Sequence, residues 1–243
     1  MKQLIEKIKR INYKYFFTEL LIVVVGILIA VSLNSWREDT VDKNREQFYL
    51  KSLKTDFNQS LASLNEIYRQ NLESFSNVKN LLDVIGSGNI NLSYDSSKSL
   101  MNKNLFGFNR FVPASGTYKE IISTGSLQIL RDNKLRIALS SWDDMVFRNR
   151  QLEDVMFWQY HIINIPYLNK HIARADYAKY NDLYIPGRKD KTNYKKLFAD
   201  TEFENVLVNR AGALKEANDY IKIMIENVKH IIDLINNDLN GEK

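Results

Sequence analysis

Apolar residues follow one another with few interruptions from Phe16 to Trp36, close to the start of the chain. As a helix, this stretch of about 21 residues would be roughly 31 Å long, which matches the hydrocarbon core of a bilayer. Tyr15 and Trp36 lie at its two ends, where amphipathic aromatic side chains anchor a span at the headgroups. The pattern therefore predicts a transmembrane helix over residues 16–36, with Tyr15 and Trp36 as its interface anchors.

Three later stretches, 42–85, 132–165 and 203–240, have apolar residues at every third or fourth position. This spacing is the period of an amphipathic helix, and the alternation typical of strands is scarce. We therefore predict an all-α fold, in which one N-terminal transmembrane helix is followed by an elongated exported helical bundle. Because 42–85 contains neither proline nor glycine, its helix can continue the membrane helix as a rigid stalk.

Local signals predict where these helices begin and end. Gly86 should end the first long helix, whereas Asp132 is a good N-cap for the second, which Pro166 should close. Between them, Thr117 and Glu120 have the spacing of a capping box that opens a short helix. One side of the second long helix is expected to be buried: Leu135, Leu139, Trp142, Val146, Leu152, Met156 and Ile163.

The order of the helices suggests how the bundle is threaded. We expect the first long helix to lead away from the membrane, the second to return and the last to lead out again. The connection 167–201 would then lie near the membrane or partway down the stalk. Its basic and aromatic residues are candidates for contact with lipid headgroups or an acidic partner: Arg188, Lys189, Lys191, Lys195, Lys196 and Tyr184. The alternative is a solvated loop whose tyrosines cover the bundle.

The net charge of +5 is distributed unevenly along the chain. The first 14 residues carry +4, Glu19 lies inside the apolar stretch, and the residues from Asn34 onward carry only +2. Basic residues before a span place the N-terminus in the cytoplasm. The predicted division is a basic cytoplasmic tail over 1–15, the span over 16–36 and a periplasmic bundle over 37–243. A single pass would anchor the protein in the inner membrane.

A cleaved signal peptide is the alternative to a membrane span. It would have the same charged start, and Ala30-Val31-Ser32 provides a small-x-small triplet for cleavage. Glu19 interrupts the apolar segment, however, and that segment is long for a signal peptide.

One side of the predicted span carries its acidic residue, its glycine, its alanine and its terminal asparagine. At about 100° per residue these positions fall within an arc of roughly 80°. We name this side the membrane stripe: Glu19, Val23, Gly26, Ala30 and Asn34. Gly26 and Ala30 form a small-xxx-small pair, which lets two helix backbones approach closely, so we interpret the stripe as a helix–helix contact. Alternatively, Glu19 reaches back to the headgroups or belongs to an ion pathway.

Two motifs resemble those of an uncharacterised family of single-span envelope proteins common in flavobacteria and other Bacteroidota. The first is the run from Glu19 to Ala30, with its Gly-Ile-Leu-Ile-Ala core, followed by Asn34-x-Trp36. The second is Gly125-Ser-Leu-Gln-Ile-Leu-Arg-Asp-Asn-Lys-Leu-Arg-Ile-Ala-Leu139. Members usually have two asparagines before the tryptophan, where this chain has Asn34-Ser35. The resemblance implies the topology and the helical architecture, and supplies no catalytic residues.

Signatures of catalytic and cofactor sites are missing from the sequence. The chain has no Cys, which excludes disulfides, thiol nucleophiles and Cys-ligated metals. No Gly-rich nucleotide motif is present, and the three histidines lack the spacing of a metal site. Trp142, Phe157 and Trp158 are expected in the bundle core. We expect no cofactor, no metal, no nucleic acid and no small-molecule substrate.

These observations favour a non-catalytic, membrane-anchored scaffold or accessory subunit. Besides membrane lipid, its partners would be further copies of itself or a larger envelope complex, contacted through the membrane stripe. The alternative is a sensor or signal-relay subunit with a periplasmic helical input domain. An envelope hydrolase, with a site assembled from scattered residues, is a lesser alternative. The biological process and the number of subunits do not follow from the sequence.

Overall fold

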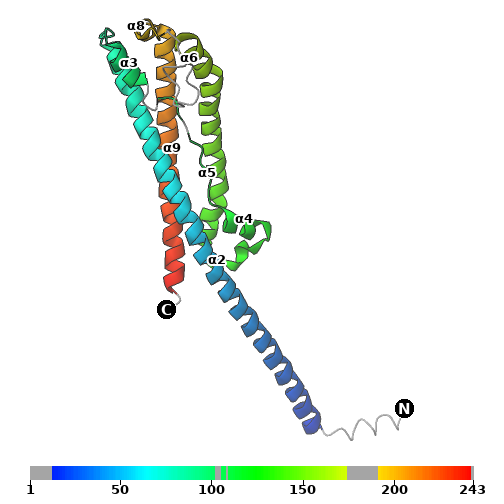
Figure 1. Ribbon diagram of the computed structural model, residues 1–243. Helices are drawn as coiled ribbons and strands as arrows, with labels where there is room; N and C mark the ends of the chain where they lie inside the picture. Colours follow the sequence, from blue (N-terminus) through cyan, green and yellow to red (C-terminus); the bar gives the residue numbers. More distant parts are fainter. Residues whose placement is uncertain (1–12, 102–104, 108, 174–190, 242–243) are drawn as a thin grey trace, which may run out of the picture.

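The computed structural model describes residues 13–101, 105–107, 109–173 and 191–241. All regular structure in these residues is helical, which confirms the predicted all-α class. The elements are shown in Figure 1 and are, in chain order, α2 (Tyr13–Gly86), α3 (Tyr94–Met101), α4 (Gly116–Ser123), the 3-10 turn η1 (Ser126–Ile129), α5 (Asn133–Trp158), the π-helical η2 (Gln159–Asn164), α6 (Ile165–His171), α8 (Tyr194–Phe198) and α9 (Thr201–Gly241).

α2 is one unbroken helix of 74 residues, about 111 Å long at 1.5 Å per residue. Its N-terminal part projects alone from the bundle (Figure 1), and every residue from Tyr15 to Arg45 is exposed. From Glu46 onward the helix buries one side. The predicted continuation of the apolar helix into the bundle is therefore confirmed. Among the described residues, α2 alone is long and apolar enough to cross a membrane.

α2, α5 and α9 form the bundle, and their apolar sides meet in two clusters. The cluster nearer the exposed part of α2 contains Leu53, Phe57 and Trp142. The rings of Phe57 and Trp142 meet edge to face, with their centroids 5.5 Å apart. The other cluster contains Val78, near the end of α2, and Phe203, near the start of α9. Burying these side chains is the main force that holds the three helices together.

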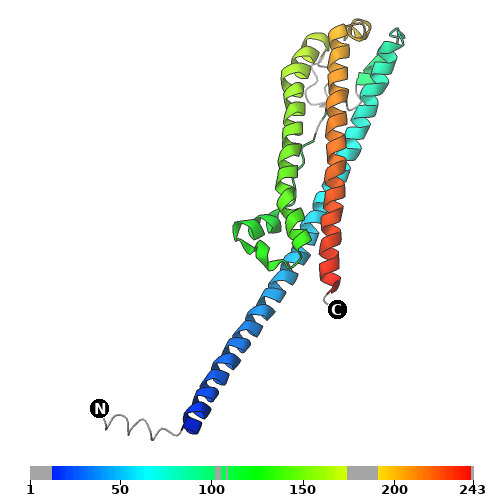
Figure 2. The ribbon, with the colours of Figure 1, turned by 180° about the vertical axis from the view of Figure 1, so that it is seen from behind.

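α5 runs in the same direction as α2, so the predicted threading is wrong. Leu135, at the start of α5, packs in the cluster with Leu53, whereas Met156, near its end, packs in the cluster with Val78. α9 then runs back and ends beside the point where α2 leaves the bundle (Figures 1 and 2). The described ends of the connection 167–201 accordingly lie at the far end of the bundle from the apolar helix.

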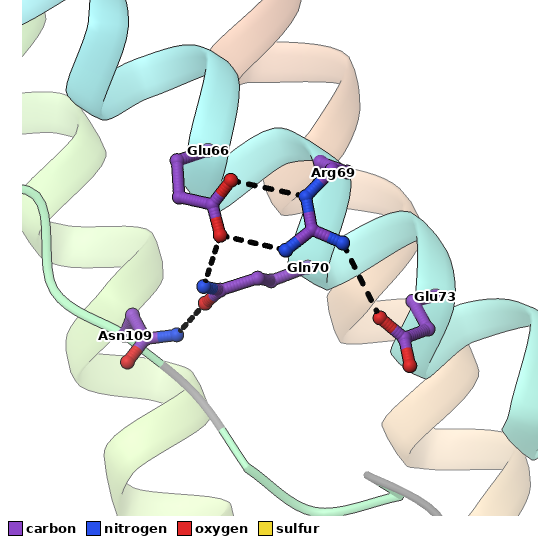
Figure 3. Close-up of polar contacts among 5 residues, drawn as sticks. All are labelled: Glu66, Arg69, Gln70, Glu73 and Asn109. Carbon is purple, nitrogen blue, oxygen red and sulfur yellow. Dashed lines mark hydrogen bonds and ion pairs between the residues drawn. The ribbon is translucent and has the colours of Figure 1, made fainter.

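The chain makes its first return between α2 and α5 without a long helix. We name residues 105–107 and 109–115, which are not helical, the strap. Its contacts, and those of α4 that follows, move steadily back along α2. Ser74 Oγ donates to Leu105 O (3.2 Å), Asn109 donates to the Gln70 side chain (Figure 3), Ala114 N donates to Ser60 Oγ (3.1 Å) and Thr117 N donates to Asp56 Oδ2 (2.9 Å). The spacing of apolar residues predicts helices but not a non-helical return segment. The order of the helices along the bundle was therefore predicted wrongly.

Thr117 and Glu120 do not form the predicted capping box. α4 begins at Gly116, two residues earlier than a cap at Thr117 requires, and its N-cap Ser115 makes no side-chain capping bond. The Thr117 N–H instead donates to α2, as described above, and Glu120 Oε1 accepts from Tyr49 Oη at 3.2 Å. Tertiary bonds to α2 take the place of the local cap. The predicted N-cap at Asp132 is confirmed, because its side chain accepts from Lys134 N.

Pro166 does not end the second long helix. α5 passes after Trp158 into η2 and then into α6, which contains Pro166 and ends at His171. Proline has no N–H, and its ring clashes with the carbonyl four residues back, which a wider π turn relieves. The extra residue in that turn moves the buried side by one position. Asn164 is therefore buried, whereas Ile163, predicted to be buried, is 42% exposed.

Two of the three aromatic residues expected in the core are exposed. Trp142 is 1% exposed and lies in the core, but Phe157 and Trp158 are 40% and 62% exposed. The Arg110 guanidinium of the strap lies over the Phe157 ring, 5.0 Å from its centroid. Phe157 therefore helps to hold the strap on the outside of α5.

Candidate functional site

The membrane stripe lies on the part of α2 that the bundle leaves uncovered. All five of its residues are exposed, and one regular helix brings them to the same side, as their spacing predicts. The apolar residues around the stripe are exposed as well; Leu21 and Ile22, for example, are each 65% exposed. An uncovered apolar surface of this length is typical of a membrane span or an interaction site.

Gly26 is the residue of the stripe that no contact within the described residues explains. A Cβ placed on it would meet nothing within 4 Å. Glycine in the middle of a helix is less favourable than alanine by roughly 0.5–1 kcal/mol. No contact of the described residues compensates for this loss of helix stability. Close approach of a helix from outside the described chain is a contact that a glycine at this position would serve.

The ends of the apolar stretch are marked by the two predicted anchors. Tyr15 and Trp36 are 72% and 71% exposed. At its C-terminal end, Asn34 Nδ2 donates to Glu38 Oε1 at 2.8 Å, and Thr40 Oγ1 donates to the Trp36 carbonyl oxygen at 2.8 Å. Exposed polar side chains thus make hydrogen bonds at this end of the stretch, as expected where a helix enters water.

A charged clamp joins the base of the bundle to α2. Glu46 is 4% exposed, and its carboxylate accepts from the Arg131 backbone N–H and lies 3.3 Å from Arg131 Nε. The Arg131 guanidinium also reaches Asp39 at 3.0 Å. Burial, together with the negative charges of Asp132 and Glu46, raises the pKa of Asp238 on α9. The clamp holds the chain at the start of α5 against α2 just where the helix becomes exposed.

Glu153 of α5 holds the middle of the strap. Its Oε1 accepts from Phe111 N at 2.7 Å and from Asn149 Nδ2 at 2.7 Å. Burial raises the pKa of Glu153, although these hydrogen bonds and the nearby Arg150 and Arg110 act in the opposite direction. A buried carboxylate that binds a backbone N–H fixes the position of the strap against α5.

Arg210 of α9 holds the upper end of the strap. Its side chain is 1% exposed; Nε donates to Leu105 O at 3.0 Å, and a terminal nitrogen donates to Gly107 O. We did not predict Arg210, Glu153 or Glu46 from the sequence as functional or structural sites. Arg210 occurs at the three- and four-residue spacing of the buried side between Leu207 and Leu214. A charged residue at a position where the helical spacing predicts burial could have identified Arg210 from the sequence.

The basic and aromatic connection is described only in part. Of its six candidates, Lys191, Lys195 and Lys196 are exposed. The other three, Arg188, Lys189 and Tyr184, lie outside the described residues. Lys191 Nζ lies 4.8 Å from the centroid of the Tyr94 ring at the far end of the bundle. About 50 residues of α2, roughly 75 Å, separate this end from Trp36, so these three lysines do not lie beside the apolar stretch.

The far end also contains a polar group around the start of α9. Asp200 caps this helix, with its Oδ1 accepting from Glu202 N at 2.9 Å, and its Oδ2 accepts from Tyr167 Oη at 2.8 Å. The hydrogen bond from Tyr167 is the main cause that lowers the pKa of Asp200. His171 stacks on Tyr167 and approaches Asp200 at 4.0 Å. The described residues contain no group of three or more His, Asp or Glu side chains placed to hold a metal ion.

Comparison with known proteins adds a family. A family model described as a family of unknown function, DUF6090, matches residues 19–158, which is more than half of the chain. The match contains both motifs on which the resemblance rests, and it covers the membrane stripe, the strap and α5. No curated protein matches the chain, and neither does any solved structure. The chain therefore belongs to the DUF6090 family of unknown function.

Proposed function

We propose that this protein is a non-catalytic, membrane-anchored helical scaffold or accessory subunit. Residues 16–36 span the inner membrane once, the tail before them is cytoplasmic, and the bundle stands in the periplasm. The membrane stripe binds a second helix, either of another copy or of a larger envelope complex. The observation that carries this proposal is the uncovered apolar side of α2, with Gly26 in a position that no contact within the described chain explains.

Two observations support a retained span over a cleaved signal peptide. α2 continues without a break through Ala30-Val31-Ser32, where cleavage would fall, into residues that bind the base of the bundle. The family match begins at Glu19, inside the apolar stretch, so this stretch is part of what members share. The orientation is supported by the +4 charge of the first 14 residues.

The unbroken helix also favours a second candidate function, a signal-relay subunit. Because α2 passes from the apolar stretch to the far end of the bundle, a change in the bundle's packing would move the span directly. The two functions differ in a simple measurement. A sensor binds a small ligand that raises its melting temperature, whereas a scaffold purifies with a partner or as a defined oligomer.

Purification in mild detergent tests the scaffold proposal. We expect a defined oligomer or a stoichiometric complex by native mass measurement. Gly26→Leu should dissociate it, because the added side chain keeps the helices apart. The matched control is Val24→Leu, which adds bulk about 160° around the helix at nearly the same depth. A lone monomer of the wild type, or equal assembly of both variants and the wild type, would overturn the proposal.

A further inference from the structure

The membrane stripe and the bundle contacts lie on opposite sides of α2. At about 100° per residue, Val41 and Phe48 fall within roughly 20° of Ala30, the centre of the stripe. Leu53 and Phe57, which are buried in the bundle, lie about 140–180° away from Ala30. The chain's own helices therefore pack behind the stripe. The stripe side stays open from the apolar stretch through residues 37–45 and up to Phe48.

This open side keeps two large apolar residues beyond the end of the span and then changes. Val41 and Phe48 are 56% and 61% exposed, although both lie outside the apolar stretch. Farther along the same side, Glu66, Arg69 and Glu73 form ion pairs, with Arg69 at 2.7 Å from Glu66 and 3.6 Å from Glu73 (Figure 3). Such exposed pairs suit a face turned toward water. A covered surface would accordingly end between Phe48 and Glu66.

We propose that a second copy of this chain covers this side, in parallel, from the span to Phe48. The inference rests on the proposed membrane assembly and names its partner. Successive positions on the open side are four and three residues apart in alternation, the spacing of a left-handed coiled coil. These positions, which we name the seam, are Ala30, Asn34, Arg37, Val41, Asn44 and Phe48.

A second copy fits the seam because each level meets its own counterpart. Two copies inserted the same way in one membrane are parallel, so equal residues face each other across a two-fold axis. Val41 and Phe48 then bury themselves against the same apolar residues. An amide has two N–H donors and one carbonyl acceptor, so Asn34 can keep its bond to Glu38 and also bond its counterpart. An asparagine that bonds its counterpart in this way helps to set the register of a parallel coiled coil.

The charges next to the seam are complementary between copies. In a parallel pair, a side chain at the position of Arg37 packs into a hole formed by four residues of the other helix. The residue after its counterpart, Glu38, borders that hole, so Arg37 of each copy faces Glu38 of the other. The pair of opposite charges offsets the repulsion between the two Arg37 side chains.

Single-cysteine crosslinking of the full-length protein in membranes tests this arrangement. The chain has no native Cys, so each introduced thiol reports alone. The seam variants are Ala30→Cys, Val41→Cys and Phe48→Cys. Lys43→Cys is the control at the same height on another side, and Glu66→Cys is the control on the same side beyond the seam. All five positions are exposed, so the substitutions leave the bundle core intact.

A disulfide needs Cα atoms within about 7 Å, so mild oxidation reads the geometry directly. We expect most of the chain to run as a covalent dimer for Val41→Cys and Phe48→Cys, and little for Lys43→Cys and Glu66→Cys. If Lys43→Cys crosslinked as much as Val41→Cys and Phe48→Cys, random collision would explain the dimers, and the seam would be overturned. Crosslinking at Ala30 but not at Val41 or Phe48 would confine the contact to the span and overturn the proposed cover up to Phe48.

The remaining outcomes separate this inference from the proposed function. A complex in mild detergent in which the cysteines link to a different protein would overturn the second copy and leave the scaffold standing. A detergent monomer with no crosslink at any position, including Ala30, would overturn both.

Discussion

The two parts of α2 present the same kinds of apolar side chain to opposite surroundings. In the bundle, Leu50 and Leu53 are 1% and 0% exposed, whereas Leu21 and Ile22 in the apolar stretch are each 65% exposed. One unbroken helix contains all of them, so the backbone hydrogen bonds are of the same kind throughout. The difference is the source of the cover. In the bundle it comes from α5, α9 and the strap, whereas before residue 46 no described residue of the chain covers the helix.

Small and polar residues show the same contrast. In the bundle, Ser60 and Ser74 are buried because they bind the strap. In the exposed part, Gly26 has open space around it and no contact that explains it. Ser60 and Ser74 are thus explained by contacts inside the fold, whereas Gly26 leaves room for close approach of a partner helix.

The largest expected effect separates the two parts by one chemical change. Leu53→Ala should lower the free energy of unfolding of the bundle by about 2–5 kcal/mol, because it leaves a cavity in the core. Leu21→Ala removes the same atoms from the exposed part and should change that free energy by less than about 0.5 kcal/mol. Denaturant unfolding in detergent measures both, followed by tryptophan fluorescence, in which the buried Trp142 reports on the core. Similar losses would mean that the apolar stretch is part of the bundle core.

A smaller effect comes from Glu153, which connects the strap to α5. Burial raises its pKa above the ordinary 4.5, so the folded protein holds this proton more tightly than the unfolded chain does. Its contribution to stability is complete below the unfolded-state pKa and is lost as the pH rises through the folded-state pKa. Glu153→Gln keeps an oxygen for the Phe111 N–H and removes the charge.

The free energy of unfolding of Glu153→Gln, relative to wild type, should therefore increase as the pH rises above 4.5. The increase is about 1.4 kcal/mol for each unit by which the pKa is raised. Unfolding curves of both proteins across about pH 4–8 measure this difference and cancel the other carboxylates. A difference that does not change with pH would show that Glu153 titrates normally.

The smallest effect is expected where the two parts meet. Asp39 and Arg131 are 63% and 49% exposed, so water screens their ion pair. Asp39→Asn should lower the free energy of unfolding by less than about 1 kcal/mol, and added salt should reduce the effect further. Unfolding at low and high salt measures it. A loss above about 2 kcal/mol would mean that the ion pair contributes to the stability of the bundle far more than an exposed pair does.

Helices and their buried sides were largely predictable from the sequence. The three- and four-residue spacing of 203–240 predicted an amphipathic helix, and α9 buries one side from Phe203 to Ile235, because burial in a helix repeats with its turn. Asp132 was predictable as an N-cap because capping is a local bond. Predictions that depended on neighbours far away in the sequence were wrong. Thr117 binds α2 instead of capping α4, and the π turn before Pro166 buries Asn164 in place of Ile163.

The candidate site divides in the same way. The membrane stripe follows from spacing alone, since a regular helix brings Glu19, Gly26 and Ala30 to one side. Its relation to the bundle did not follow, because that depends on which side of α2 the other helices choose. The basic connection was expected near the membrane, but its described ends lie at the far end, because the strap makes the first return.

By itself, then, the sequence determined the helical class, the length of the apolar stretch and the stripe on its side. Each of these depends on interactions between residues a few positions apart along one helix, or on the length of a run. Only the tertiary structure decided the direction of α5, the course of the strap and the side of α2 that stays open. Those features depend on contacts between residues 30 to more than 100 positions apart, such as Ser74 with Leu105 and Arg210 with Leu105. A local period carries no information about which of many apolar sides will meet.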